Sequence, residues 1–139
     1  MNELDAIAVR LRGGTCLAEL LDAGFDAFEV IRLVARAGED GAPELFATFM
    51  VTAGTAVEGR NALTDAPSLP PATRRPKITM SSTVGTDQIA DELAALAALL
   101  TQCLAGAGAQ AAREGDRAAC RHAVDAAAEI HRLLASGPR

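Results

Sequence analysis

Residues 89–107, IADELAALAALLTQCLAGA, decide the fold class, because their apolar side chains recur at the spacing of a helix. The steps between them alternate between four and three residues, which places one apolar stripe along a helix, as in a coiled-coil heptad. The sequence therefore predicts a long, largely buried helix that begins at Thr86 or Asp87. The stripe consists of Ile89, Leu93, Leu96, Leu100, Cys103 and Ala107.

The same stretch is long enough to raise the question of a membrane span. Residues 93–112 contain no charged residue over 20 positions, about the length that crosses a bilayer. Most of them are alanine and glycine, and three are polar, so they contribute little to the free energy of membrane insertion. We therefore predict a helix that is buried in protein, and no membrane partner.

The cysteines and the N-terminus indicate a cytoplasmic protein. Cys16, Cys103 and Cys120 are an odd number without paired spacing, so neither a zinc cluster nor a thioredoxin-type site is indicated. The first ten residues, MNELDAIAVR, have acids where a secretory signal needs bases and an apolar run. Free thiols in a reducing compartment are the expected state.

The N-terminal part, residues 1–65, carries several shorter helical patterns. We expect a first helix over residues 3–12 and a second helical stretch that opens at Thr15 and is interrupted at Gly24. Asp26 and Glu29 have the spacing of a capping box, which predicts that a helix restarts at residue 27. A second heptad-like stripe runs through this region, at positions 17, 21, 24, 28, 31 and 35.

One string in this region, Asp22 to Val34 (DAGFDAFEVIRLV), resembles the prosthetic-group site of acyl carrier proteins. In that family a serine opens the helix and its hydroxyl carries phosphopantetheine. The matching residue here is Ala27, which has no attachment atom. We therefore interpret the string as a capping box and predict no cofactor.

A further helix is predicted from Pro43 to about Leu63, because proline suits the first helical turn and apolar residues recur behind it. Residues 66–86 contain four prolines and a Ser/Thr cluster, and are predicted to form a linker. The last helix is expected from Arg117 to Ala135, after a stop at Gly115 and a cap at Asp116. No strand-like alternation is present.

The predicted architecture is all-α, a single-domain bundle of four to five helices over residues 1–139. The linker, residues 66–86, separates the helices of residues 1–65 from a helical hairpin over residues 87–139. The chain has 31 alanines and no tryptophan or tyrosine, so its helices must approach one another closely. The net charge of −5, without a strongly basic face, argues against nucleic acid as a partner.

The residue types that carry chemistry form no catalytic pattern. No phosphate loop, nucleophile elbow or zinc-protease motif is present. His122, Asp125 and Glu129 share a helical face, but an alternating row of charges beside them is typical of a solvated surface. His131 is expected to be a boundary histidine, and Cys16 to be structural. We therefore predict no catalytic or metal site, although an enzyme stays possible.

Two hypotheses for function follow from the sequence. The first is a non-enzymatic interaction protein that self-associates or binds a protein partner, because two heptad-like stripes offer more apolar surface than alanine-rich neighbours cover. The second is a binder of a small apolar or amphipathic ligand, with aromatic side chains around a pocket and basic linker residues over an anionic head group. Its site would comprise Phe25, Phe28, Phe46, Phe49, Met50, Arg74 and Arg75.

Overall fold

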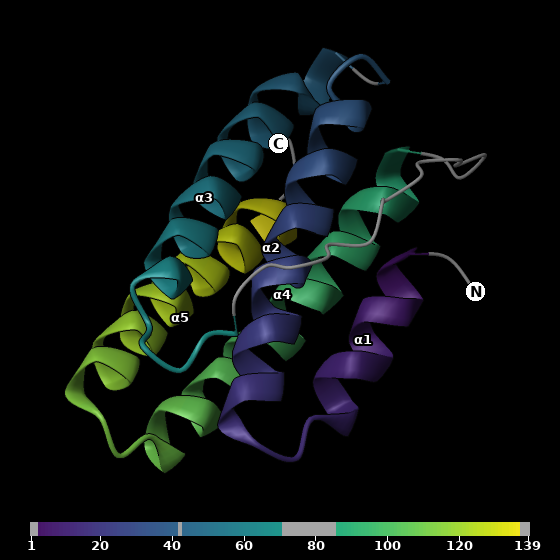
Figure 1. Ribbon diagram of the computed structural model, residues 1–139. Helices are drawn as coiled ribbons and strands as arrows, with labels where there is room; N and C mark the ends of the chain where they lie inside the picture. The colour runs from purple at the N-terminus through teal and green to yellow at the C-terminus, as the bar shows by residue number, and fades with distance from the viewer. Residues whose placement is uncertain (1–2, 42, 71–85, 137–139) are drawn as a thin grey trace.

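The computed structural model describes residues 3–41, 43–70 and 86–136, and this part of the chain is all-helical (Figure 1). It contains five α-helices, a short 3-10 helix η1 and no strand, so the predicted fold class is confirmed for the described residues. The elements are α1 (Glu3–Gly13), α2 (Leu17–Gly38), η1 (Pro43–Leu45), α3 (Phe46–Thr64), α4 (Thr86–Gln110) and α5 (Glu114–Ser136).

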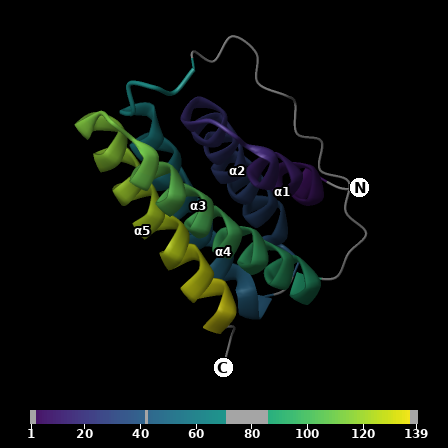
Figure 2. The same cartoon turned by 90° about the horizontal axis from the view of Figure 1, so that it is seen from below.

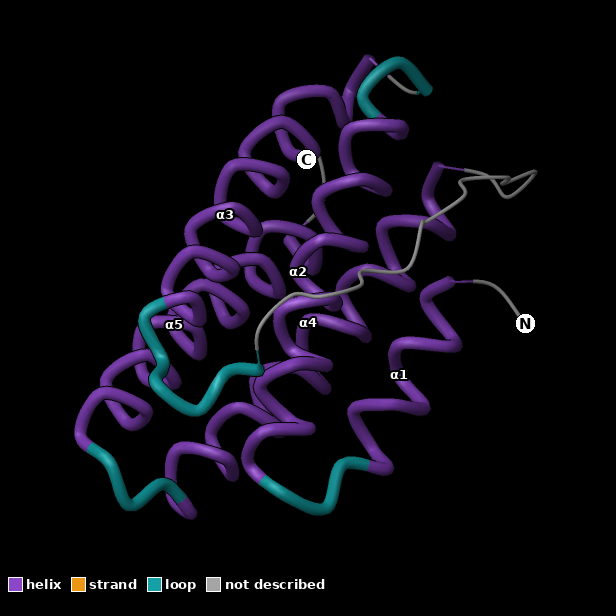
Figure 3. Tube along the Cα trace, in the orientation of Figure 1, coloured by secondary structure: helices purple, strands orange, loops and turns teal. Residues whose placement is uncertain are grey.

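Four of the helices close a ring. α2 packs on α3, α3 on α5, α5 on α4, and α4 on α2, while α1 lies against α2 and α4. Figure 2 shows α1 and α5 on opposite sides of the molecule, and Figure 3 shows the short loops that join α1 to α2 and α4 to α5. One continuous hydrophobic cluster includes residues from all five helices.

The interface between α2 and α3 depends on two phenylalanines that lie on two glycines. The ring of Phe28 in α2 covers Gly59 in α3, where a Cβ atom would stand 2.4 Å from the ring. The ring of Phe49 in α3 covers Gly38 in α2, where the corresponding distance is 2.9 Å. Both rings are fully buried. The pairs are reciprocal: each helix supplies one phenylalanine ring and one glycine on which the ring of the other helix packs.

The predicted interruption at Gly24 is wrong, because α2 runs without a break from Leu17 to Gly38. Gly24 serves packing instead of ending a helix. A Cβ atom there would meet Leu104 of α4 at 3.1 Å and Leu63 of α3 at 3.3 Å. The glycine lets two neighbouring helices approach the backbone of α2, and this outweighs its cost in helix propensity.

The capping box predicted at Asp26 and Glu29 is also wrong, since both residues lie within α2. Asp26 is only 6% exposed, and its carboxylate accepts a hydrogen bond of 2.7 Å from the Arg10 guanidinium of α1. Arg10 also bonds Asp22 at 3.2 Å. These bonds hold α1 on α2, so a sequence pattern that resembles a cap serves to join two helices.

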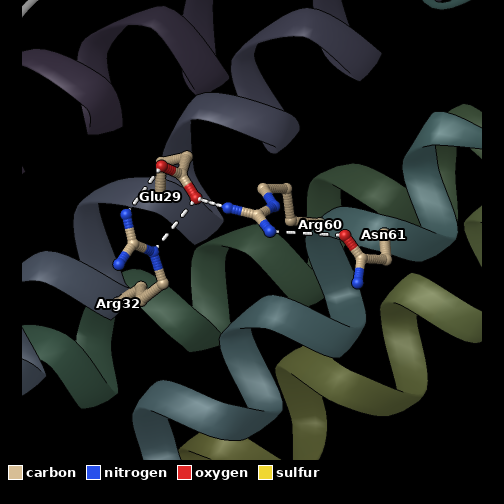
Figure 4. Close-up of polar contacts among 4 residues, drawn as sticks. All are labelled: Glu29, Arg32, Arg60 and Asn61. Carbon is tan, nitrogen blue, oxygen red and sulfur yellow. Dashed lines mark hydrogen bonds and ion pairs between the residues drawn. The ribbon is translucent and has the colours of Figure 1, made fainter.

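Glu29 joins α2 to α3 in the same way. Figure 4 shows its carboxylate between the guanidinium groups of Arg32 and Arg60, while Arg60 also donates to Asn61. Burial alone raises the pKa of Glu29, but the hydrogen bonds from Arg32 and Arg60 and their positive charges outweigh it. The net effect is a lowered pKa, so the ionised carboxylate is favoured in the folded protein.

Of the predicted linker, the structure describes Thr86, which begins α4, and residues 66–70, which lie against α5. Asp116 is 1% exposed and accepts two hydrogen bonds from Ser68, 2.9 Å from the backbone nitrogen and 2.6 Å from the hydroxyl. The prediction that Asp116 caps a helix is wrong, because α5 already begins at Glu114. Pro67 packs on Gly115, where a Cβ atom would come within 3.0 Å.

Both heptad-like stripes face the interior. Positions 21, 24, 28, 31 and 35 of α2 are buried, as are positions 93, 96, 100 and 107 of α4. These stripes are therefore used in the core and are not available for binding a second copy or a protein partner. Among the described residues, Gln88–Gln110 is long and apolar enough to cross a membrane, a property shared by core helices of soluble proteins.

Replacement of glycine by alanine should have opposite effects on stability at two positions of α3, one covered by a ring and one open. Gly59→Ala is expected to lower the free energy of unfolding by about 1–3 kcal/mol, because the new methyl group collides with the Phe28 ring. The matched control is Gly54→Ala, where a Cβ atom meets nothing within 4 Å, and it should gain about 0.5–1 kcal/mol. Urea unfolding at low micromolar concentration measures both. Equal effects at the two positions would contradict the packing described.

The lowered pKa of Glu29 predicts a pH-dependent contribution to stability. A group whose folded pKa is depressed stabilises the protein above its unfolded pKa, and the contribution is lost as the pH falls through the folded pKa. We expect Glu29→Gln to cost about 1 kcal/mol at pH 7. The cost should shrink as the pH drops below about 4.5, the ordinary value for a glutamate. Urea unfolding from pH 3 to 7 tests this, and a cost that did not change with pH would contradict it.

Candidate interaction site

The five apolar residues predicted to surround a ligand do not share one pocket. Phe28 and Phe49 are fully buried in the core, and Phe25 is partly buried against it. Phe46 and Met50 are exposed on the outside of α3. The two basic members of the set, Arg74 and Arg75, lie outside the described residues.

The exposed residues belong to an apolar surface that we call the α3 patch, made of Phe46, Ala47, Met50, Val51 and Gly54. They are three, four or seven residues apart, so their side chains lie on one face of the helix. Three side chains provide most of the area, with 43% of Phe46, 51% of Met50 and 46% of Val51 exposed. Large apolar side chains gathered in this way mark a contact surface more often than scattered ones do.

The composition of α3 explains why one of its faces stays apolar in solvent. The helix is apolar on average, but its apolar residues are not confined to one side. Residues 46–57 contain no charged side chain. The buried side of α3 even includes Thr52, whose hydroxyl has no hydrogen-bond partner among the described residues. Among the described residues, α3 packs against α2, α5 and the short η1, so the outer side of residues 46–54 is left uncovered by them.

A hollow of about 560 Å³ lies beside the patch, between α3 and α5. Glu58 and Asp65 of α3 line it together with Asp125 and Glu129 of α5, and His122 lies at the same surface. The hydrogen bond and the charge of Arg132 lower the pKa of Glu129, so this carboxylate is ionised at neutral pH. The hollow is therefore negatively charged and open to solvent, which makes it unsuitable for an anionic or apolar ligand.

A smaller hollow of about 240 Å³ lies between α1 and α4. Its apolar lining includes Val9, which is 55% exposed, and Leu99. Charged side chains interrupt this lining, with Arg12 from α1 and Glu92 from α4. The α3 patch has no such interruption, and among the described residues it contains Phe46, Met50 and Val51, three of the large apolar side chains that are exposed.

Of the residues that could carry chemistry, His122, Asp125 and Glu129 line the same hollow. Within residues 3–41, 43–70 and 86–136, no group of histidine, cysteine and carboxylate side chains could hold a metal ion. His122 and His131 are both exposed on α5. The thiol of Cys16 donates to Glu19 at 3.2 Å, at the start of α2.

No protein-family model matches the chain, and neither a curated protein nor a solved structure is similar to it. A function must therefore be inferred from the molecular surface.

Sequence reasoning placed Phe46 and Met50 around a ligand pocket, and the structure leaves both side chains exposed on α3. The informative signal was the absence of charge from residue 46 to residue 57, because a helix with one solvated face normally carries charged residues on it. The spacing of apolar residues does not reveal this surface, because it shows where these residues recur and not which of them a neighbouring helix buries.

The three cysteines should react at different rates. Burial raises the pKa of Cys103, and the charge of Arg12 offsets this only in part. Burial also raises the pKa of Cys120, and the negative charge of Asp116 adds to the effect. Cys16 is exposed. We expect Ellman's reagent at pH 8 to modify one thiol quickly and the other two only on unfolding. Loss of the fast phase in Cys16→Ser would identify it, and three equal rates would contradict the assignment.

Proposed function

We propose that the protein is a non-enzymatic helical interaction protein, and that it self-associates through the α3 patch. The observation that carries this proposal is the exposed, uncharged face that residues 46–54 of α3 present. The apolar stripes of α2 and α4 do not contribute, because they are used in the core. The proposal keeps the function expected from the sequence and moves it to a different surface.

The absence of charge makes the α3 patch compatible with a second copy of the chain. Each copy carries a net charge of −5, so two copies repel one another wherever their acidic surfaces meet. Residues 46–57 contribute no charge and are therefore a place where two copies meet without pairing like charges. The negative hollow beside the patch would favour a basic partner instead, and salt dependence separates the two cases.

The size of the patch predicts a weak dimer. A helix that covers the patch buries on the order of 300–500 Å² per copy, below the roughly 800 Å² per partner of a standard stable interface. We therefore expect a dissociation constant on the order of 10–100 µM. Reversible association of this strength also suits a surface that must stay soluble when the copies separate.

We also propose that the whole chain is one domain with residues 66–86 as a connection inside it. One hydrophobic cluster includes residues from helices on both sides of this segment, and Ser68, which lies within the segment, donates to Asp116 of α5. Removal of either set of helices would expose the core residues of the other. Neither half is therefore expected to fold alone.

Sedimentation velocity over a range of concentrations tests self-association. We expect Met50→Asp to weaken the dimer at least tenfold, because a charge would be buried against an apolar surface. The matched control is Val9→Asp, which places the same charge on an equally exposed valine at the α1/α4 hollow. It should leave the dissociation constant unchanged. Equal effects of the two substitutions, or a strictly monomeric wild type at 500 µM, would contradict the proposal.

Salt provides a second measurement on the same dimer. Raising the salt concentration screens the repulsion between two copies of charge −5 and leaves the contact between uncharged residues in place. The dimer should therefore become somewhat tighter between 50 and 500 mM NaCl. Weaker association at high salt would indicate contacts between opposite charges, as expected for the acidic hollow, and would count against the patch.

A further inference from the structure

We infer that α1 is an autoinhibitory cover, which opens as a unit and exposes a docking site on α2 and α4 for a helix of a partner protein. The partner helix carries an arginine beside apolar residues, as α1 itself does. In the closed structure, α1 occupies the docking site. Among the described elements α1 contacts only α2 and α4, so the site is separate from the α3 patch.

The fold leaves α1 outside the ring that contains most of the core. α2, α3, α5 and α4 contact one another in a closed circle, and α1 lies on the side of the molecule opposite α5 (Figure 2). Among the described residues of α1, only Ile7 and Leu11 are buried, and the other buried apolar side chains lie between residues 20 and 134. A segment with few buried apolar contacts opens at a lower free energy than the rest of the protein. α1 therefore detaches while the ring keeps its own core.

The docking site has an acidic wall and an apolar wall. On α2, Asp26 accepts a hydrogen bond of 2.7 Å from Arg10, and Asp22 accepts one of 3.2 Å from the same guanidinium. On α4, Leu96 and Leu99 line the hollow that borders α1. Opposite charges on the two sides of a contact fix which partner fits and in which register. An anionic wall beside an apolar wall thus selects a helix that presents an arginine next to apolar residues.

α1 has the pattern that this site selects and competes with a partner for it. Ile7 and Leu11 are four residues apart and share a face, and Arg10 lies beside them. Residues 14–16 join α1 to α2. A connection this short holds α1 at an effective concentration on the order of millimolar. A helix from another protein therefore docks weakly until α1 detaches.

Cys103 reports whether the cover is open. Its thiol donates to the backbone carbonyl of Leu11, at 3.6 Å, near the end of α1. Cys120 is 1% exposed in α5, and no described residue of α5 contacts α1. The unfolding that exposes Cys103 is therefore that of α1 alone, whereas Cys120 requires the ring to unfold. Two single-thiol proteins, with the other cysteines replaced by serine or alanine, allow Ellman's reagent to measure each rate.

Substitutions in the ring and in α1 separate the two kinds of opening. Gly59→Ala strains the contact between α2 and α3 equally with α1 closed or open. It should raise the labelling rate of Cys120 about fivefold or more and leave that of Cys103 unchanged. Arg10→Met removes the bonds to α2 and should raise the rate at Cys103 by roughly fivefold or more. The matched control is Arg132→Met, an exposed arginine that pairs within α5, and it should not change the rate at Cys103.

Two results of this labelling experiment would overturn the cover. Equal acceleration of Cys103 and Cys120 by Gly59→Ala would mean that both thiols wait for the whole protein to unfold. A rate at Cys103 that Arg10→Met leaves unchanged would mean that α1 does not control access to this thiol. Circular dichroism confirms that each variant is folded.

A labelled peptide with the sequence of residues 2–14 tests the docking site itself. In the full chain, Arg10→Glu turns a negative charge toward Asp22 and Asp26, so α1 leaves its place. Fluorescence anisotropy should show the native peptide binding this variant about tenfold or more tightly than the wild type, because α1 no longer competes. A peptide that itself carries Arg10→Glu should bind neither protein.

Each other outcome of the peptide experiment counts against a part of the inference. Binding of the native peptide to neither protein would overturn the docking site, and equal binding to both would overturn the role of α1 as its cover. Tight binding of the charge-reversed peptide would overturn the selection for arginine. Slow labelling of Cys120 shows that the Arg10→Glu chain keeps its ring. If that protection is lost, Arg10→Met takes its place in the same measurement.

Discussion

The contact between Phe28 and Gly59, together with its reciprocal between Phe49 and Gly38, is the constraint on which the rest of the structure depends. Both rings are fully buried, and both lie on a backbone without a side chain. These contacts set how closely α2 and α3 approach. In a chain with 31 alanines and four phenylalanines, the few large rings must fill the space that the small residues leave. The remaining helices pack around a hairpin whose spacing is already determined.

Three carboxylates, of which Asp26 and Asp116 are buried and Glu29 is half-buried, then align the helices that apolar contacts alone would let shift along one another. Asp26 holds α1 through Arg10, Glu29 holds α3 through Arg60, and Asp116 holds residues 66–70 through Ser68. Hydrogen bonds have definite directions, whereas contacts between leucine and alanine tolerate small shifts along a helix. The three acids therefore determine how the helices are aligned, and the unbroken interior of the ring provides the stability.

Much of the fold could be predicted from the sequence, and the errors have a common cause. The heptad pattern of residues 89–107 predicted α4, and the position of Pro43 predicted the start of α3 to within a few residues. Gly24, Asp26 and Asp116 were assigned to helix ends, because local patterns of glycine and acid resemble caps. In the structure, each of the three has a partner distant in the sequence: Leu104, Arg10 and Ser68. The α3 patch could not be predicted from periodicity, which does not report which apolar residues a neighbour covers, and its signal in the sequence was the lack of charge over residues 46–57.

The covered glycines also restrict how this sequence can change over generations. Every replacement of glycine adds at least a Cβ atom, so no single substitution at Gly38 or Gly59 avoids the aromatic ring above it. The ring has to shrink first. A change of Phe28 to a smaller residue opens a gap that a later change at Gly59 can fill, whereas the opposite order passes through an overpacked intermediate. The α2–α3 hairpin therefore has a preferred mutational order, and its two Phe–Gly pairs are sites of sign epistasis.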